Sequence, residues 1–487
     1  MLKITLLYPS HLEMLGTSKF KRFGIYAGAG KIPERPHIGI GYLSESLTRN
    51  GYEHDFVDMN LLGSYRDFKS RTKRFSPDVI GLTMVTPGYL HAYKLIKQIK
   101  KDFPKSKMIV GGPHIGVTME QIFKDCPQID VGFVSEAEQS LIDYLDSDGD
   151  PEKAKGVIYK NNRKIVFNPP ELEEKIDKFG FPKYQKFDLQ KYSGVGLYTS
   201  RGCPFRCIFC TVEAYRRKRF RGRSVKSIIE EIIYWYERGQ KLFPIEDDNF
   251  TLDMDRISRL YDEIKKLKLK DLQFALGQGI RADRVNRKLL RKMYNAGFKY
   301  ATIAVEGGNN KVLKSLNKGE TIERIEKTIK DACEIGYEVR LLFVVGAPGE
   351  TWKDIEDSFR IAKKYPVMYS RFNNLLPIPG TELFDWVKKE NLFITPPEKY
   401  LNSYNMDYTK PWYETPELTA EERKRSIMIS DKINQSLFFK YLLKKLKKIG
   451  PIRYPVAFFA SRKMIQSIMS EYPIFYKLAL LARRKII

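Results

Sequence analysis

Strand-like and helix-like segments alternate along most of this chain, and the alternation is the strongest constraint on its fold. Over the first 150 residues, short apolar runs are separated by segments whose apolar residues recur at helical spacing. The predicted strands are Lys3–Tyr8, His54–Asp58, Asp78–Val85, Met108–Gly111 and Asp130–Val134. The predicted helices are Ile38–Arg49, Tyr89–Phe103, Thr118–Lys124 and Glu136–Leu145. This pattern indicates an α/β fold, and we expect residues 1–150 to form a doubly wound parallel sheet.

A second alternation begins at residue 195, after a less periodic stretch, 151–194, that we expect to be a connector. Its predicted strands are Val195–Ser200, Lys241–Ile245, Leu272–Leu276, Tyr300–Val305, Val339–Val345 and Arg371–Leu376. Helical patterns follow each of the first five strands. Six such units predict a partial (β/α)6 barrel over residues 195–395, with its chemistry at the C-terminal ends of the strands.

The alternation stops near residue 396, and we expect residues 396–487 to form a basic, mostly helical C-terminal region. Thr419–Tyr441 has the periodicity of a helix, and the acidic pair Glu421 and Glu422 suits a helix N-terminus. Residues 435–487 hold 12 Lys and Arg against one acid, Glu471, which gives a local net charge of +11.

The chain as a whole is also basic. Its 487 residues hold 85 Lys and Arg against 59 Asp and Glu, a formal net charge of +26. This balance favours anionic partners such as nucleic acid, phospholipid surfaces or phosphorylated substrates, although a Lys-rich solvated surface is the simpler explanation. No stretch approaches about 18 uninterrupted apolar residues, and the N-terminus has the pattern of a strand, not of a signal peptide. We therefore expect a cytoplasmic protein.

Three of the five cysteines fall within eight residues. Cys203, Cys207 and Cys210 are spaced CxxxCxxC after the first predicted barrel strand, whereas Cys126 and Cys333 are isolated. An odd number of cysteines without a signal peptide argues against a disulfide framework. Three thiolates can hold a 4Fe–4S cluster and leave one iron open for chemistry. The alternative is a zinc knuckle or three buried thiols, but zinc sites usually pair Cys with Cys or His, and no His lies nearby.

The string from Arg201 to Cys210, with Phe209 before the last cysteine, resembles the signature of the radical S-adenosylmethionine superfamily. The resemblance implies that Cys203, Cys207 and Cys210 hold the cluster and that S-adenosylmethionine chelates its fourth iron. One-electron reduction would then cleave the cofactor to a 5′-deoxyadenosyl radical, which abstracts hydrogen from the substrate. An electron donor such as ferredoxin or flavodoxin is implied as a partner.

Further matches to the superfamily follow the predicted barrel strands in order. The resemblance implies that the residues after the second strand contact the amino group of the cofactor, and that those after the fifth contact its adenine or ribose. The residues implied in S-adenosylmethionine binding are Phe209, Asp247, Asp248, Gln278, Arg281, Glu306, Gly346 and Pro348. For each of them taken singly, an ordinary turn or helix cap is the alternative.

Ahead of such a barrel, the doubly wound domain resembles the cobalamin-binding domain found in this superfamily. The residues implied in cobalamin binding are Asp58, Asn60, Thr83, Met84, Val85, Gly111 and Gly112. The DxHxxG loop of the family appears here as Asp58 to Gly63, with Asn60 where the axial His would be. Because an amide is a poor cobalt ligand beside imidazole, a bound cobalamin should lack a lower His ligand. A sheet of the same fold without a corrin is the alternative.

The resemblance covers residues 1–395 and implies a cobalamin-dependent enzyme of the methylase and cyclase group. Such an enzyme would abstract hydrogen from an unreactive carbon of a hydrophobic or lipid-like substrate and then transfer a methyl group from methylcobalamin. One alternative is radical cyclisation or carbon–carbon coupling without cobalamin. Another, of a different class, is a nucleic-acid-binding protein with a structural metal site. The charge suggests it, but the chain has no recognisable RNA-binding module.

The basic tail interleaves aromatic residues with its cations. The aromatic residues of this tail include Phe438, Phe439, Tyr441, Phe458, Phe459, Phe475 and Tyr476. Basic residues are attracted to anionic leaflets and aromatic side chains are favoured at the interface, so we expect peripheral membrane contact by the tail. Alternatively, the same aromatics pack on the barrel while the lysines face water, and the prolines at 451, 455 and 473 break any long helix.

Overall fold

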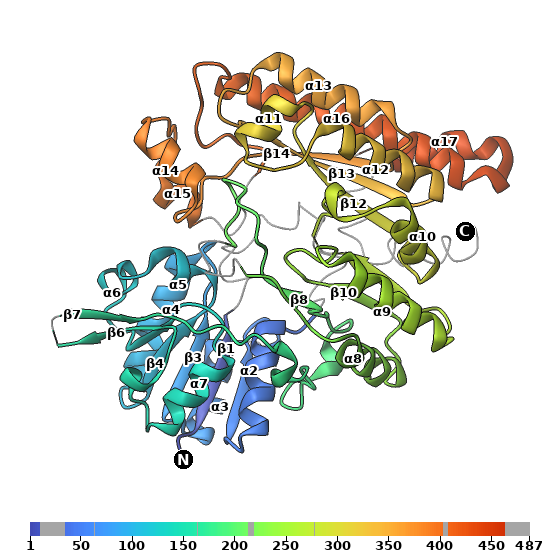
Figure 1. The fold of residues 1–487 in the computed structure, drawn as a ribbon. Helices are drawn as coiled ribbons and strands as arrows, with labels where there is room; N and C mark the ends of the chain where they lie inside the picture. The colour runs from blue at the N-terminus through green and yellow to red at the C-terminus, as the bar shows by residue number, and fades with distance from the viewer. Residues whose placement is uncertain are drawn as a thin grey trace.

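Two α/β units make up the structure, a computed structural model that describes residues 1–9, 35–62, 64–162, 164–212, 219–276, 278–402 and 408–462. The N-terminal unit, in blue, and the barrel unit, in green to orange, meet along one side in Figure 1. Gly63 and the end of the tail, 463–487 with Phe475 and Tyr476, lie outside the described residues. None of the helices within the described ranges combines the length and apolar character needed to cross a bilayer.

A seven-stranded sheet forms the centre of the N-terminal unit, with the order β2-β1-β3-β4-β5-β6-β7. The strands are β1 (Ile4–Tyr8), β2 (His54–Asp58), β3 (Val79–Thr83), β4 (Lys107–Gly111), β5 (Val131–Phe133), β6 (Val157–Asn161) and β7 (Lys164–Asn168). The first five are parallel, as predicted, and Ile4 pairs with both His54 and Val79. The order reverses at β1, which places the crevice of the sheet at the carboxyl ends of β1 and β3.

Helices cover both faces of this sheet (Figure 1). One face carries α2 (Ile38–Arg49) and α7 (Glu138–Asp146). The other carries α3 (Tyr65–Phe75), α4 (Tyr89–Asp102), α5 (Pro113–Thr118) and α6 (Gln121–Asp125). Side chains alternate along β1, so Leu6 lies in the first core and Leu7 in the second. The core under α2 and α7 continues through Tyr184 and Phe187 into the barrel, so the two units share one hydrophobic core.

The expectation of an irregular connector over residues 151–194 is wrong for its first part. β6 and β7 form an antiparallel hairpin, and β6 pairs with β5, so the hairpin extends the N-terminal sheet. Its turn contains Asn162 with a φ of 55°, a left-handed conformation that asparagine adopts more readily than most residues. The signal for a hairpin was therefore in the turn and not in the weak periodicity of the flanking residues.

Five regular parallel strands and one extended segment form an open barrel in the second unit. β10 (Leu242–Ile245) pairs with β11 (Gln273–Leu276), while β12 (Tyr300–Glu306), β13 (Glu338–Val345) and β14 (Tyr369–Asn374) form a second parallel set. Single bridges from Phe274 to Phe298 and from Ile280 to Ile303 join the two sets. The helices include α8 (Val225–Glu237), α9 (Met254–Lys266), α10 (Arg287–Asn295), α12 (Ile322–Ile335) and α13 (Trp352–Lys364). The predicted α/β fold with a partial barrel is confirmed.

The first predicted barrel strand, Val195–Ser200, is extended but is a regular strand only at its end. Leu197 bridges Ile245, and its N–H donates to the Pro244 carbonyl at 2.8 Å. The Leu197 carbonyl accepts the Glu246 N–H at 2.9 Å in return. Pro244 has no N–H to donate to the Val195 carbonyl, which accepts the Gln240 side-chain amide instead, so the ladder does not extend back to Val195. The chain then turns away, so that β8 (Ser200–Arg201) pairs antiparallel with β9 (Arg221–Gly222).

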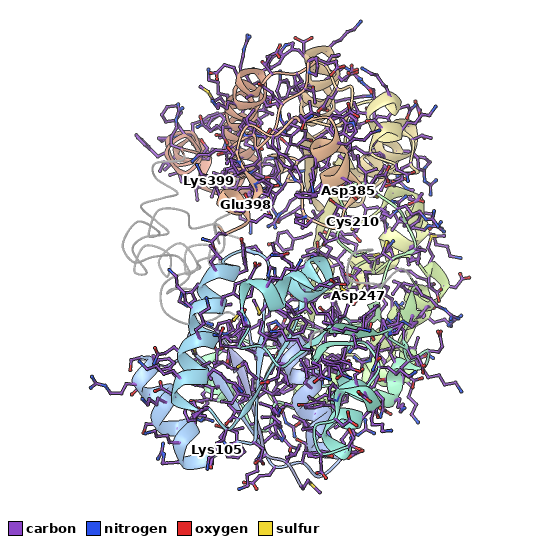
Figure 2. All side chains as sticks on the ribbon, turned by 90° about the vertical axis from the view of Figure 1, so that its left-hand side faces the viewer. Lys105, Cys210, Asp247, Asp385, Glu398 and Lys399 are labelled. Atoms are coloured by element: carbon purple, nitrogen blue, oxygen red, sulfur yellow. The ribbon has the colours of Figure 1, made fainter. Side chains whose placement is uncertain are left out.

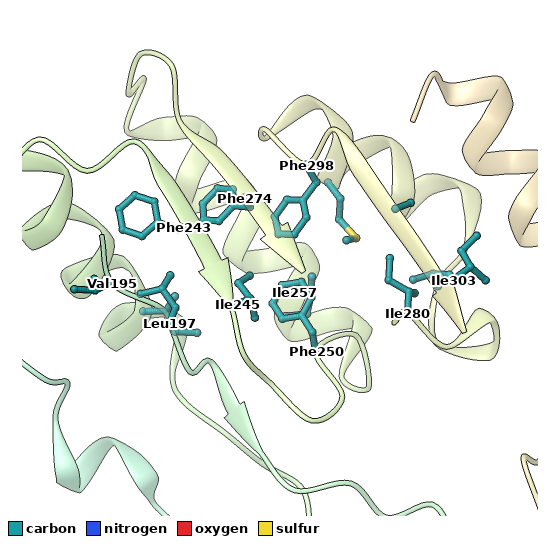
Figure 3. Close-up of a cluster of buried hydrophobic side chains, with 14 of the residues drawn as sticks. Val195, Leu197, Phe243, Ile245, Phe250, Ile257, Phe274, Ile280, Phe298 and Ile303 are labelled. Atoms are coloured by element: carbon teal, nitrogen blue, oxygen red, sulfur yellow. The ribbon is translucent and has the colours of Figure 1, made fainter. Parts of the chain in front are cut away.

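Aromatic rings pack between the barrel strands and helix α9 (Figure 3). Phe274 stacks on Phe298 with 4.9 Å between ring centroids, and Phe250 stacks on Phe298 at 5.8 Å. Tyr261 of α9 contacts Phe298 edge-on at 5.3 Å. This packing fixes the carboxyl ends of β10 and β11, where four of the predicted site residues follow: Asp247, Asp248, Gln278 and Arg281.

The long helix α16 (Ala420–Lys445) packs beside β14 (Figure 1). Thr419 and Glu422 form a capping box at its start, in agreement with the predicted acidic N-terminus. The side-chain oxygen of Asn434 accepts the backbone N–H of Ser370 in β14 at 2.8 Å. The boundary expected at residue 395 therefore does not separate α16 from the barrel, because this helix is part of the barrel packing.

Candidate active site

The loop that follows β8 carries the three clustered cysteines, and hydrogen bonds fix it at several points. At its start, the carboxylate of Asp248 accepts the Gly202 N–H at 2.8 Å. In its middle, the Ile208 N–H donates to the Leu316 carbonyl at 3.2 Å, and the Ile208 carbonyl accepts the Leu383 N–H at 2.9 Å. The loop is therefore tied to segments that follow β10, β12 and β14.

The three thiols are half-buried and free of disulfides. Figure 2 shows Cys210 at the level where the two units meet. Burial raises the pKa of Cys207, whereas the nearby Lys318 and Arg281 lower it. The amide of Asn249 lies 3.6 Å from the Cys203 sulfur.

These thiols fit a 4Fe–4S cluster better than a single metal ion. Within the described ranges, no three His, Cys, Asp or Glu side chains converge at the distances that one ion requires. A cube binds its three protein ligands through three different irons, so the ligands surround the cube and do not meet at one point. Three free thiols on a fixed loop, close to two cations, provide the donors and the charge that an anionic cluster needs.

A buried charge network lies against the cysteine loop. The guanidinium of Arg281 lies 3.5 Å from the centre of the Phe205 ring and donates to the Lys318 carbonyl at 2.8 Å. The ammonium of Lys318 lies 3.2 Å from Glu306 and 3.5 Å from Glu320. Burial opposes the charge of Lys318, but the two carboxylates raise its pKa, so the ammonium stays protonated.

Arg281 and Glu306 of this network were among the residues predicted to bind the cofactor, whereas Lys318 and Glu320 were not. Glu306 has a φ of 63°, a left-handed conformation that is rare for such a residue and marks a constrained position. The available signal was the pair of charges flanking Gly319 in a turn shortly after a barrel strand.

Asp247 and Asp248 both support the segment that carries the cysteines. Asp247 is fully buried, and its carboxylate accepts the Thr199 N–H at 2.6 Å and the Thr199 and Ser200 hydroxyls at 2.5 Å each. Burial raises the pKa of Asp247. With Gln278 it lines a small pocket that is otherwise formed by Ile245, Phe250, Thr251, Leu276, Gly279 and Ile280. The hydrogen bonds of the Asp247 carboxylate thus hold the start of β8 in place.

Phe209 packs into an apolar cluster behind the loop, together with Ile208, Leu316, Leu375 and Leu383. This contact anchors the last turn of the cysteine loop to the residues that follow β14. The position before the last cysteine thus stabilises the loop through apolar packing.

Glycine is required at position 346 by the close approach of another side chain, whatever ligand this turn binds. Gly346 has a φ of 104°, and a Cβ there would lie 2.3 Å from Nη2 of Arg423. Arg423 is buried, donates to the Val345 carbonyl at 3.2 Å and belongs to α16. The Tyr413 hydroxyl donates to the Gly346 carbonyl. The backbone of this turn is therefore already bonded to the protein, while the neighbouring Pro348 is partly exposed.

Glu350 closes the same turn and makes the free energy of unfolding depend on pH. Its carboxylate accepts the Gly346 and Ala347 N–H groups, and burial raises its pKa to about 7. Because the folded state holds this proton more tightly, the free energy of unfolding should fall by about 3 kcal/mol as pH rises from about 4.5 to 7. Glu350→Gln should remove most of this dependence, as measured by denaturant midpoints between about pH 5 and 8. The exposed Glu356→Gln is the control and should leave the profile unchanged.

At the carboxyl end of β2, Asp58 organises the turn in which a His ligand is missing. Its Oδ1 accepts the backbone N–H and the side-chain amide of Asn60, both at 2.8 Å. Its Oδ2 accepts the Tyr192 hydroxyl at 2.7 Å, so the segment before the barrel contacts this end of the sheet. The Asn60 amide is thus bonded to Asp58, and a cobalamin without a lower His ligand stays a prediction.

The turns after β3 and β4 lie directly against each other. Gly112 has a φ of 96°, and a Cβ there would lie 2.6 Å from the Met84 carbonyl and 2.9 Å from the Thr83 hydroxyl. The Met84 N–H donates to the Gly111 carbonyl at 2.7 Å. Met84 is buried, whereas Thr83 and Val85 are partly exposed. The predicted cobalamin residues of both turns therefore lie together at the carboxyl edge of the sheet, beside the crevice between β1 and β3 where doubly wound proteins bind ligands.

Two arginines of the β8–β9 ladder reach across to the N-terminal unit. Arg201 lies 2.7 Å from Glu138 and 3.0 Å from Glu136, and Arg221, its partner in the ladder, also binds Glu136. All four side chains are at most 7% exposed. Since Arg201 precedes Cys203 by two residues, this network ties the cysteine loop to the N-terminal unit. Sequence analysis missed it because the pairs join positions 63 to 85 residues apart.

Two family models match the chain at these two units. The Radical SAM superfamily matches residues 197–362, and the B12 binding domain matches residues 33–145. An uncharacterized methyltransferase of Pyrococcus horikoshii is 31% identical over 373 residues, which cover 74% of this chain and 80% of that protein. The chain belongs to the radical S-adenosylmethionine superfamily, in the group that carries a B12 binding domain.

Other relatives agree with this membership. The cytidylyl-2-hydroxyethylphosphonate methyltransferase of Streptomyces wedmorensis is 26% identical over 447 residues, covering 78% of this chain and 82% of that protein. The structure of the cobalamin-dependent S-adenosylmethionine radical enzyme OxsB, with aqua-cobalamin and S-adenosylmethionine bound, is similar in fold. It has a TM-score of 0.73 and 17% identity, and the match covers 97% of this chain and 72% of that one. Methyltransferases and a cyclase occur among the curated relatives.

The protein is an enzyme of the cobalamin-dependent radical methyltransferase and cyclase group, as the resemblance implied. Membership brings a 4Fe–4S cluster, S-adenosylmethionine and cobalamin as its cofactors. It also argues against a zinc knuckle and against a nucleic-acid-binding protein with a structural metal.

Proposed function

We propose that this enzyme abstracts hydrogen from an unreactive carbon of a hydrophobic substrate and transfers a methyl group to that carbon. The observation that carries the proposal is the buried contact between Arg201 and Glu138. Glu138 begins α7 just after β5, so the contact sets the cysteine loop beside the carboxyl edge of the B12 domain. When bound, the cluster supplies the electron that cleaves S-adenosylmethionine, and cobalamin supplies the methyl carrier.

In this proposal the side chains of the chain itself divide the work of positioning. Cys203, Cys207 and Cys210 hold the cluster. Asp248 fixes the start of their loop, and Arg281 fixes its side through the Phe205 ring. In the N-terminal unit, the two adjacent turns after β3 and β4 would bind the corrin.

Apolar and aromatic side chains line the seam between the two units, which supports a hydrophobic substrate. Tyr89 of α4 packs with Leu376 and Tyr400, which lie beyond β14 in the chain. On its other side, Tyr89 stacks on His114 with 5.0 Å between ring centroids. The backbone N–H of His114 donates to the Met84 carbonyl at 3.2 Å. These aromatic side chains therefore connect the predicted corrin-binding turns to the end of the barrel. Such a wall favours apolar ligand surface over charged groups.

The test of this function follows two products of S-adenosylmethionine. Holoenzyme with about one corrin per chain is incubated with S-adenosylmethionine and reduced ferredoxin or flavodoxin. Cleavage at the cluster gives 5′-deoxyadenosine, while loss of the methyl group leaves S-adenosylhomocysteine, so a methyl-transferring enzyme should form both. An enzyme that only cyclises or couples its substrate would form 5′-deoxyadenosine alone, and this result would overturn the proposal.

Two glycine variants assign the corrin to its crevice in the same assay. Gly112→Ala places a Cβ against the Met84 carbonyl, so this variant should lose the corrin and S-adenosylhomocysteine formation but keep its iron. Gly51→Ala is the matched control, since Gly51 also has a positive φ, of 74°, but nothing lies within 4 Å of its added Cβ. Full corrin loading of Gly112→Ala would show that these turns do not bind the corrin.

A further inference from the structure

Helix α17 (Arg453–Ala460) and the residue before it expose an unusual amount of apolar surface. Five side chains, which we call the α17 surface, are between 41% and 65% exposed: Ile452, Tyr454, Val456, Phe458 and Phe459. They are half of the ten large apolar side chains that are exposed in the described part of the chain. Singly scattered apolar residues are ordinary on a protein surface, but a cluster of this density within eight positions marks an interaction site.

The α17 surface is held at the outside of the molecule by a sharp change of chain direction. Gly450, with a φ of 60°, and Pro451 interrupt the helical path between α16 and α17. In α17, the small side chain of Ala457 is fully buried against the protein. In Figure 1, α17 lies at the outer end of the barrel unit, on the side away from the N-terminal unit. The rest of its apolar surface faces outward.

Cations lie in and just ahead of α17, and one of them, Lys445, is paired with Glu338 of β13 at 2.7 Å. Residues 435–462 contain seven Lys and Arg and no Asp or Glu: Lys440, Lys444, Lys445, Lys447, Lys448, Arg453 and Arg462. Arg453 and Arg462 lie over the rings of Tyr454 and Phe458, with 5.0 and 4.1 Å from guanidinium carbon to ring centroid. Lys447 and Lys448 are exposed at the kink. The surface is therefore apolar in its middle and positive at its edge.

We propose that the α17 surface binds the interface of an anionic lipid bilayer. Aromatic and aliphatic side chains enter the boundary between headgroups and acyl chains, while lysines and arginines beside them remain among the anionic headgroups. Charge complementarity favours this partner over an apolar groove of another protein. A negatively charged bilayer surface can attract the cations beside the helix while its interior takes up the apolar side chains, whereas an apolar groove would leave the cations without counter-charges. This inference is independent of the reaction assigned to the active site.

Vesicle flotation of the full-length protein tests this binding. We compare vesicles of phosphatidylcholine alone with vesicles that also contain phosphatidylglycerol. The wild-type chain should float with the anionic vesicles, and added salt should weaken the binding because it screens the charges. Absence of flotation, or equal flotation with both lipids, would overturn the proposal.

Matched variants locate the contact. Phe458→Ser together with Phe459→Ser should lower vesicle affinity about tenfold or more, since two rings no longer leave water. The control pair, Met428→Ser with Ile394→Ser, removes two side chains of similar exposure, 64% and 45%, outside the α17 surface and should bind as the wild type does. Unchanged thermal unfolding of both variants confirms that each is folded. Equal affinity of the two pairs would show that the α17 surface is not the binding site.

Two alternative explanations, a lipid contact made by residues 463–487 and a second copy of the chain on the α17 surface, give different outcomes. A chain that ends at Arg462 should still bind anionic vesicles, and its failure to bind would assign the contact to residues 463–487 instead. Sedimentation in the absence of lipid should give the same mass for the wild type and for the Phe458→Ser, Phe459→Ser variant. A wild-type dimer that this variant dissociates would show that a second copy of the chain covers the surface.

Discussion

Replacing Cys203, Cys207 and Cys210 together with alanine is expected to abolish both the iron content of the protein and its formation of 5′-deoxyadenosine. Anaerobically prepared wild-type protein should be brown and carry about four irons per chain, as one 4Fe–4S cube requires. All three thiols lie on the loop after β8, and the described part of the chain has no other thiol there to replace them. Iron analysis, absorbance and product chromatography measure the loss.

The remaining cysteines provide the control for this experiment. Cys126 is buried in the core of the N-terminal unit and Cys333 lies in α12, so replacing both with alanine should leave iron and product unchanged. A triple variant that kept its iron would contradict the assignment of the cluster to this loop.

Arg201→Met is expected to destabilise the whole protein strongly. The substitution leaves the buried Glu138 without its partner and Glu136 with Arg221 alone. Removing one partner of a buried ion pair typically costs about 3–5 kcal/mol, because the other charge stays buried and uncompensated. The midpoint of denaturant unfolding should fall accordingly. Since the same residue positions the cysteine loop, loaded protein should also form less 5′-deoxyadenosine at a temperature where it remains folded.

A second arginine between the two units gives a matched control for this effect. Arg35 lies 3.0 Å from Glu246, but its side chain is 35% exposed and that of Glu246 24%. Water and salt screen such a pair, so Arg35→Met should cost no more than about 1 kcal/mol. Equal losses for the two variants would show that burial of the Arg201 network is not what stabilises the junction.

The sequence was sufficient to predict the elements whose pattern is local. α2 occupies its predicted bounds, Ile38–Arg49, because its apolar residues recur at helical spacing over three turns. The first barrel strand was predicted over Val195–Ser200, but the ladder there is broken by Pro244 in the neighbouring strand. A strand's regularity depends on its partner, and the partner lies more than 40 residues away.

The same difference between local patterns and distant partners explains which parts of the candidate site could be predicted. Cysteine spacing is a local signal, and it located the cluster loop. The close approach of Arg423 to Gly346 could not be predicted, because this arginine comes from a helix 77 residues later. A glycine pattern reports that something comes close to the backbone, but it does not tell whether that group is a ligand or another part of the chain.

An open barrel has an edge that a closed one lacks. Among the described residues, β14 pairs with β13 on one side only, so its other side would offer free N–H groups as a template for a foreign strand. Asn434 of α16 takes the Ser370 N–H at 2.8 Å, and the Tyr408 carbonyl takes the Asn374 N–H at 2.7 Å. Helix α16 and the segment before it thus occupy N–H groups of this edge, and we expect a chain shortened ahead of Ala420 to expose part of the edge to its own copies.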